Sequence, residues 1–231
     1  MGNWLPKLAV RYEYASARAA MQVMLILIVV TLALSCENLG APGLWPALGY
    51  AKYRGPNGGP VFSFEGPRGW LVSTNEPRKD DARYGIPKSW SVTLLGPEDP
   101  KGYLLTALTV EAIPPKADGG FLDRPAELLQ NLRGSERVEN REDDVLYYRI
   151  DSVDDTLVNG RPAIQIVSRS REPLIREGRL DTSKIVSQIE MTTAVEGRAY
   201  TFIVRLSADQ SEESKYVEVY KRAVGTLRFS E

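Results

Sequence analysis

The chain has 231 residues, of which 43% are hydrophobic and 26% are charged, a composition typical of a folded domain. Its 29 basic side chains balance 30 acidic ones, so no excess of positive charge favours nucleic acid as a partner. One cysteine and no histidine exclude an internal disulfide, His-based catalytic triads and most familiar metal sites, and no cofactor is predicted.

The first 35 residues have the organisation of an export signal. Lys7, Arg11 and Arg18 give a basic start, and a predominantly apolar run covers residues 23–34. This run is shorter than the roughly 20 residues that a transmembrane helix needs. Met21 precedes the run and is a second candidate start of translation. The pattern predicts a signal peptide over residues 1–35, and a retained membrane helix is the alternative.

The signal ends on the sequence LALSC, which resembles the lipobox of bacterial lipoproteins. The resemblance implies cleavage after Ser35 and attachment of diacylglycerol to Cys36. The lipid would hold the protein on the extracytoplasmic side of the cell membrane or the outer membrane. Ala33 stands where leucine is commoner in the lipobox. A plain secretory signal, in which Cys36 is incidental, is the other interpretation.

Residues 36–60 are rich in glycine and proline, which predicts a tether between the membrane and the folded domain. Trp45, Tyr50 and Tyr53 interrupt this segment. We expect these aromatic side chains to pack along the domain, and the membrane interface is the alternative location.

Residues 61–231 are predicted to form a single domain, which begins with alternating apolar and polar residues. Such alternation is typical of strands with one buried face. Turn-forming residues between the strands predict four hairpins, which join residues 61–64 with 70–73, 90–95 with 103–113, 145–153 with 163–168, and 185–191 with 200–206.

Two helices are predicted in the same domain. Pro125 begins the first, over residues 125–132, and Gly134 follows its end. In the second, Asp209 is the expected cap, and apolar residues recur at helical spacing at Val217, Tyr220, Val224 and Leu227. The resulting fold class is α+β, an antiparallel sheet flanked by helices.

Three segments resemble PsbP-like and DcrB-like exported proteins. Residues 61–70, VFSFEGPRGW, resemble the aromatic strand and Pro-x-Gly-Trp turn of that family, residues 191–202, MTTAVEGRAYTF, resemble its final hairpin, and residues 227–230 resemble its ending. The resemblance implies an α/β/α sandwich and a non-enzymatic accessory role at a membrane-associated complex. The metal-associated residues of the photosynthetic subgroup have no match in this sequence, so the resemblance implies no metal site.

Charged clusters suggest sharper functions, and each has a simpler interpretation. Oxygen ligands for calcium are present at Glu142, Asp143, Asp144, Asp151, Asp154 and Asp155. Candidates for an anion site are Arg169, Arg171, Arg176 and Arg179. Acidic residues interrupt the basic run, and the acidic groups fall at predicted strand ends, so solvated surface is favoured for both.

Two functional classes remain open. The first is a lipid-anchored accessory module that binds an unidentified membrane-associated protein. The second is an extracytoplasmic module for a small or polymeric ligand, with Trp70, Tyr84 and Trp90 lining a concave face. A hydrolase that uses paired carboxylates is less favoured, because the sequence has no other sign of an active site. We therefore predict no catalytic residues.

Overall fold

The computed structural model describes residues 48–78, 81, 85–97, 106–141, 144–176 and 179–230, without the side chains of residues 141, 144, 174–176 and 179–184. These residues fall within one compact unit, Pro42–Glu231. The predicted signal peptide lies outside the described residues, and so do Ser35 and Cys36.

Strands dominate the described part of the chain. They are β1 (Tyr50–Arg54), β2 (Val61–Pro67), β3 (Leu71–Asn75), β4 (Trp90–Leu95), β5 (Ala107–Ile113), β6 (Arg137–Arg141), β7 (Asp144–Val158), β8 (Arg161–Arg176), β9 (Arg179–Glu196), β10 (Thr201–Asp209) and β11 (Arg228–Ser230). The helices are the short 3₁₀ turns η3 (Lys116–Asp118) and η4 (Gln210–Glu212), and the α-helices α2 (Pro125–Arg133) and α3 (Glu213–Thr226).

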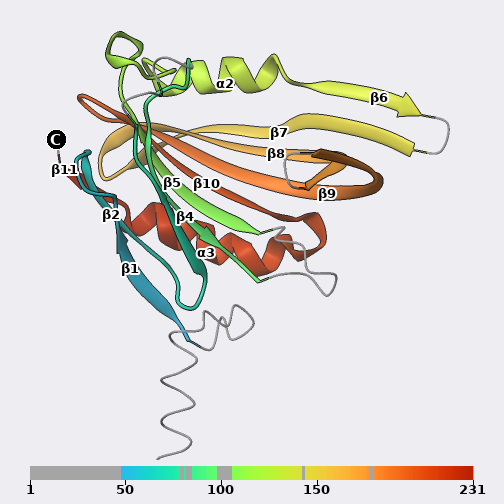
Figure 1. Cartoon of the computed structure of the whole chain (residues 1–231), viewed down its shortest axis with the longest axis horizontal. Helices are drawn as coiled ribbons and strands as arrows, with labels where there is room; N and C mark the ends of the chain where they lie inside the picture. Colours follow the sequence, from blue (N-terminus) through green and yellow to red (C-terminus); the bar gives the residue numbers. More distant parts are fainter. Residues whose placement is uncertain are drawn as a thin grey trace, which may run out of the picture. The chain divides into compact units, whose positions relative to one another are not determined.

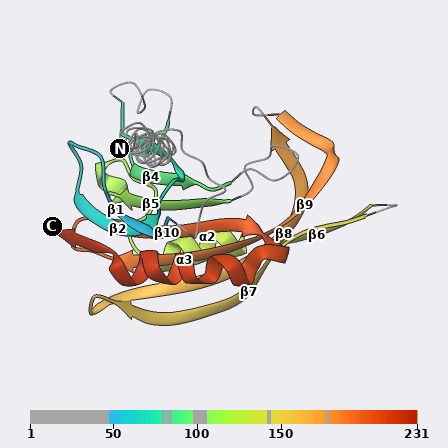
Figure 2. The same cartoon turned by 90° about the horizontal axis from the view of Figure 1, so that it is seen from below.

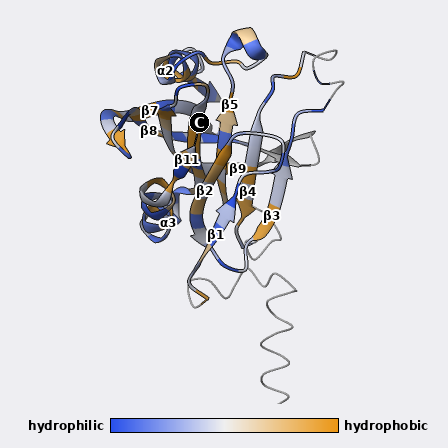
Figure 3. Ribbon diagram, turned by 90° about the vertical axis from the view of Figure 1, so that its left-hand side faces the viewer, coloured by the Kyte–Doolittle hydropathy of each residue, from blue (hydrophilic) through white to orange (hydrophobic). Residues whose placement is uncertain are grey.

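The strands form two antiparallel sheets. The larger has the order β3-β4-β5-β10-β9-β8-β7-β6, and the smaller has the order β1-β2-β11 (Figure 1). Helices α2 and α3 lie on opposite sides of the larger sheet (Figure 3). The predicted α+β class, an antiparallel sheet flanked by helices, is therefore confirmed.

Both faces of β10 are buried over its first four residues, 201–204, which include three consecutive apolar side chains. Phe202, Val204 and Leu206 lie in the main hydrophobic cluster together with residues of α3 and β2. Ile203 points to the other face, where it packs with Leu128 of α2. Successive side chains of a strand alternate between faces, so this strand joins two cores. Figure 2 shows α3 running along the sheet near β10.

Helix α3 packs a different stripe from the predicted one. Its buried residues are Tyr216, Val219, Tyr220 and Ala223, whereas Val217 and Val224 are only partly buried. The predicted stripe was therefore right at Tyr220 and at Leu227, which is fully buried just after the helix end, and only partly right at Val217 and Val224. Asp209 caps the 3₁₀ turn η4 that leads into α3, since its carboxylate accepts a hydrogen bond from the Ser211 amide at 2.8 Å. The N-cap residue of α3 itself is Glu212, which makes no side-chain cap, so the predicted cap lies one turn before the α-helix.

The predicted opening hairpin is wrong. Strand β2 pairs with β1 and β11 in the smaller sheet, whereas β3 pairs with β4 at the edge of the larger one. The turn at Gly69, which has a φ of +78°, therefore carries the chain from one sheet to the other. Local turn signals show that the chain reverses or bends but not which strand it pairs with. The other three predicted hairpins are confirmed.

The folded part begins before the predicted boundary at residue 61. Strand β1 lies inside the predicted tether and pairs with β2. The Tyr53 ring stacks on Phe64 at 5.7 Å, and its hydroxyl donates to the Pro67 carbonyl at 2.8 Å. Tyr50 lies beneath the Arg222 guanidinium of α3. Tyr50 and Tyr53 thus pack on the domain as predicted, while Trp45 lies outside the described residues.

The predicted Asn159-Gly160 turn is fixed to the end of the chain. Both residues have positive φ, +54° and +75°, which suits a two-residue hairpin turn. The Asn159 amide donates to the Leu227 carbonyl at 2.5 Å, and its oxygen accepts from Arg228 at 2.9 Å. The β7–β8 hairpin is therefore anchored at its turn.

We expect Tyr220→Phe to lower the free energy of unfolding by about 1–2 kcal/mol. The hydroxyls of Tyr220 and Thr193 form a buried hydrogen bond between α3 and β9, and burial raises the pKa of Tyr220. Removing one partner leaves the Thr193 hydroxyl buried without that bond. Urea unfolding of Tyr220→Phe, Thr193→Val and the double variant measures the effect. The double variant should lose less than the sum of the two single losses, and full additivity would contradict the coupling.

Candidate interaction site

A groove lies between the start of α2 and the neighbouring ends of β7, β8 and β9, and we call it the α2 groove. Its volume is about 380 Å³. It is lined by Arg124, Pro125, Ala126, Asp155, Thr156, Leu157, Pro162, Ala163, Ile164 and Glu196. Six of these ten residues are apolar and three, Arg124, Asp155 and Glu196, are charged.

Strand periodicity places an apolar side chain at the rim of the groove. Val158 is only 5% exposed and belongs to the core on the α3 side. Its neighbour Leu157 must therefore point to the opposite face, where it is 68% exposed. Pro162 lies directly across from Leu157 on β8. The exposure of Leu157 is thus a consequence of the burial of Val158.

Helix α2 supplies the other wall. Pro125 occupies the first turn, where its fixed φ and missing N–H are tolerated. Leu128 is buried against Ala194 and Ile203 of the sheet, which fixes the helix in place. Ala126 projects only a methyl group into the groove, so space remains beside Leu157. The groove is therefore built from elements that the core already holds together.

Charged groups surround the groove and continue along α2. Lys116 and Glu127 form an ion pair of 2.6 Å on the neighbouring surface. Their hydrogen bond raises the pKa of Lys116 and lowers the pKa of Glu127. The Asp123 carboxylate accepts from the Lys116 amide at 2.8 Å. An apolar centre with a polar rim is the usual anatomy of a protein–protein contact surface.

Arg169, a member of the predicted arginine run, is paired with carboxylates. Arg169 donates to Asp151 and, at 2.7 Å, to Glu213 at the start of α3. Arg149 also donates to Asp151, at 2.9 Å. Further along the hairpin, Arg176 lies opposite Arg179 in the strand register. Arg169 therefore ties the base of the long β7–β8–β9 hairpins to α3.

The acidic residues described in the structure are dispersed. Asp154 and Asp155 are exposed neighbours on β7, so their side chains point to opposite faces of the sheet. Glu142 and Asp143 lie outside the described residues. Within the described ranges, no group of three or more acidic or cysteine side chains could hold a metal ion.

The predicted aromatic ligand face is wrong at Trp70. Trp70 is 3% exposed and meets the Tyr216 ring edge-on at 6.0 Å inside the core. Trp90 is half-buried and contacts the Tyr200 ring at 5.8 Å. Tyr84 lies outside the described residues. Large aromatic side chains have much apolar area, so their burial in the core stabilises the fold.

Sequence reasoning missed the residues that line the α2 groove. The available signal was Leu157, which follows a polar stretch and directly precedes an apolar residue and the Asn159-Gly160 turn. Two adjacent apolar residues at a strand end cannot both face one core.

Across the part of the chain that is described, no helix is long and apolar enough to cross a bilayer.

Comparisons with known proteins place the chain beside several solved structures. No model of a protein family and no curated protein matches the sequence. Cyanobacterial PsbP from Synechocystis sp. PCC 6803 is 10% identical, with 79% of this chain and 94% of that chain covered and a TM-score of 0.47. Protein PA94 of Pseudomonas aeruginosa, of unknown function, is 16% identical, with 79% and 98% covered and a TM-score of 0.42.

A third similar structure is LpqN of Mycobacterium tuberculosis, which is involved in cell envelope biogenesis. It is 15% identical, with 79% of this chain and 92% of that chain covered and a TM-score of 0.35. At these identities a comparison concerns the fold alone, and no activity, ligand or partner is transferred.

Proposed function

We propose that the chain is an exported lipoprotein, anchored through Cys36, whose folded part is a non-enzymatic accessory module for a membrane-associated protein. The α2 groove is the observation that carries the proposal for the folded part. Its mainly apolar lining accepts apolar side chains of the partner, and Arg124, Asp155 and Glu196 offer charged contacts that fix the partner's position.

The open form of the groove favours a protein partner over a small ligand. Small-molecule pockets enclose most of the ligand surface within concave, largely preformed walls. Leu157 at the rim is 68% exposed, so a small molecule beside it would stay largely in contact with water. An apolar residue on a partner surface would be covered by the rest of that partner.

Carboxylate chemistry has little support at this site. A carboxylate hydrolase needs one acid whose pKa is raised by an apolar environment and a second, ionised carboxylate nearby. Asp155 and Glu196 are the carboxylates that border the groove, and both residues are exposed. Neither carboxylate therefore lies in the apolar surroundings that the acid of such a hydrolase requires.

We expect Leu157→Asp to reduce partner capture at least tenfold, about 1.4 kcal/mol of binding free energy. The new carboxylate would have to be desolvated against the partner's apolar side chain. The tagged full chain is crosslinked in intact cells of its native host, and captured proteins are identified and quantified. Leu71→Asp is the matched control, because Leu71 is an exposed leucine on β3, remote from the groove in the strand order.

Capture of one recurrent membrane protein by the wild type and by Leu71→Asp, and its loss in Leu157→Asp, would support the proposal. Equal capture by all three proteins would move the contact surface away from the α2 groove. Since both leucines are exposed, each substitution should change the free energy of unfolding by less than about 0.5 kcal/mol.

A further inference from the structure

Strand β6 forms an outer edge of the larger sheet. It is the last strand in the order and pairs with β7 alone among the described strands. Figure 1 shows it as an extended outer strand beyond α2. Residues 135–140 are all exposed, and Val138 at the centre of the strand is 69% exposed. An edge of this kind presents one row of backbone groups that a further strand can pair with.

The opposite charges on either side of Val138 make β6 complementary to a second copy of itself. Two identical strands can pair antiparallel about a two-fold axis perpendicular to the sheet, which keeps each side chain on its own face. With Val138 on the axis, Val138 lies opposite its own copy. Arg137 then lies opposite the second copy's Glu139, and Glu139 lies opposite the second copy's Arg137. Opposite charges at facing positions stabilise an antiparallel pair.

Other symmetric registers are less favourable. An axis at Arg137 or at Glu139 places two like charges directly opposite each other, which is destabilising. An axis at Asn140 pairs Glu139 with the second copy's Arg141 but puts two polar amides at the centre. It also moves Arg137 beyond the end of the second copy's β6. The Val138 register alone combines an apolar centre with two flanking ion pairs.

Apolar surface next to Val138 enlarges this contact. Tyr147 on β7 lies directly opposite Val138, and the Arg149 guanidinium lies 5.3 Å from the centre of the Tyr147 ring. Val145, opposite Asn140, is 46% exposed and shares the same face. Two-fold pairing brings both copies of these side chains to one continuous surface. Helix α2 packs inboard, on the face of β7, β8 and β9, and among the described elements only β7 pairs with β6.

The Arg137 guanidinium can donate hydrogen bonds to a second carboxylate. Its guanidinium donates to Glu172 on β8, so in the single chain the side chain reaches inward across β7. A guanidinium carries five N–H donors, so one carboxylate does not saturate it. The Arg137 side chain remains 60% exposed.

We infer that two copies of this chain pair through β6, with Val138 on the two-fold axis, to form a dimer with one continuous sheet. The inference goes beyond the proposed function and does not depend on it. The α2 groove lies at the opposite end of β7, near the β7–β8 turn, so both contacts can form at once.

Cysteine crosslinking of the purified full chain tests the register. In the inferred dimer the two Val138 Cα atoms lie about 4.5–5.5 Å apart, within the range of a disulfide. Val138→Cys should give a disulfide-linked dimer under mild oxidation. Val61→Cys is the matched control at 70% exposure, and the wild type reports any background from Cys36. Asn140→Cys should not crosslink above that background.

Charge exchange provides an independent test by sedimentation at graded protein concentration. Arg137→Glu and Glu139→Arg should each abolish the dimer, because each places like charges opposite each other. The double variant should restore it, and a mixture of the two single variants should form a heterodimer. Formation of the heterodimer in the mixture also shows that the single variants are folded.

Three results would overturn the inference. A crosslink at Asn140→Cys without one at Val138→Cys would assign a different register. The wild type could stay monomeric at all concentrations, with no crosslink at Val138→Cys. This result would mean that the charged residues of β6 prevent another strand from pairing with this edge. Single charge variants that dimerise like the wild type would remove the ion pairs from the interface.

Discussion

Cys36→Ala is expected to move the protein from the membrane fraction to the soluble fraction. Burial of acyl chains contributes about 0.8 kcal/mol per methylene, so the two chains of a diacylglycerol hold a protein firmly at a bilayer. Without the thiol no thioether to the lipid can form. Detergent phase separation of cell extracts measures the change, and most of the protein should transfer from the detergent phase to the aqueous phase.

Ser35→Ala is the matched control for anchoring. Alanine is also a small residue before the cysteine, so cleavage and lipid attachment should continue and the protein should stay in the detergent phase. Unfolding curves of the soluble Cys36→Ala protein should match those of the wild type, because Cys36 precedes every described element. Retention of Cys36→Ala in the detergent phase would instead favour an uncleaved membrane helix over residues 23–34.

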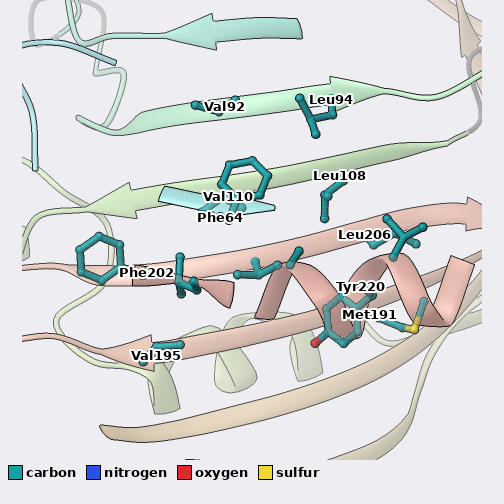
Figure 4. Close-up of a cluster of buried hydrophobic side chains, with 14 of the residues drawn as sticks. Phe64, Val92, Leu94, Leu108, Val110, Met191, Val195, Phe202, Leu206 and Tyr220 are labelled. Atoms are coloured by element: carbon teal, nitrogen blue, oxygen red, sulfur yellow. The ribbon is translucent and has the colours of Figure 1, made fainter. Parts of the chain in front are cut away.

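Phe202→Ala is expected to lower the free energy of unfolding by about 3–5 kcal/mol. Phe202 is fully buried on β10, the strand that joins β5 to β9 at the centre of the larger sheet (Figure 4). Its ring stacks on Phe229 of β11 at 4.3 Å and meets Phe62 of β2 edge-on at 6.1 Å. Truncation therefore leaves a cavity where the two sheets and the end of the chain meet.

A loss of this size is a large share of the roughly 5–15 kcal/mol that stabilises a typical domain. Urea unfolding followed by circular dichroism measures it. Phe202→Leu is the control, because leucine fills much of the same volume and should cost less than about 1.5 kcal/mol. Should Phe202→Ala unfold within about 1 kcal/mol of the wild type, the two sheets would not share the core that the contacts of Phe202 indicate.

Secondary structure in the domain could largely be predicted from local patterns. The hairpins around Asn159-Gly160 and Glu196-Gly197 follow from alternating strands joined by residues that favour tight turns. Helix α2 follows from Pro125 at its start and an apolar stripe. These features depend on neighbours within a few residues, which a sequence displays directly.

Elements with few local signals were missed. Strand β6 carries mostly polar residues because it is an exposed edge, so it lacks the alternation that marks a half-buried strand. Strands β1 and β11 are short and gain their stability from pairing with β2. Most of the energy that orders such strands comes from distant partners, which no local window contains.

By itself the sequence determined the α+β class, most of the hairpins, both α-helices and the lack of histidine and thiol ligands in the domain. Only the tertiary structure decided which strands pair across the two sheets, because long-range register depends on the packing of both faces together. It likewise decided that Trp70 belongs to the core and that Leu157 does not. The α2 groove arises from this difference, since the burial of Val158 on one face turns Leu157 outward on the other.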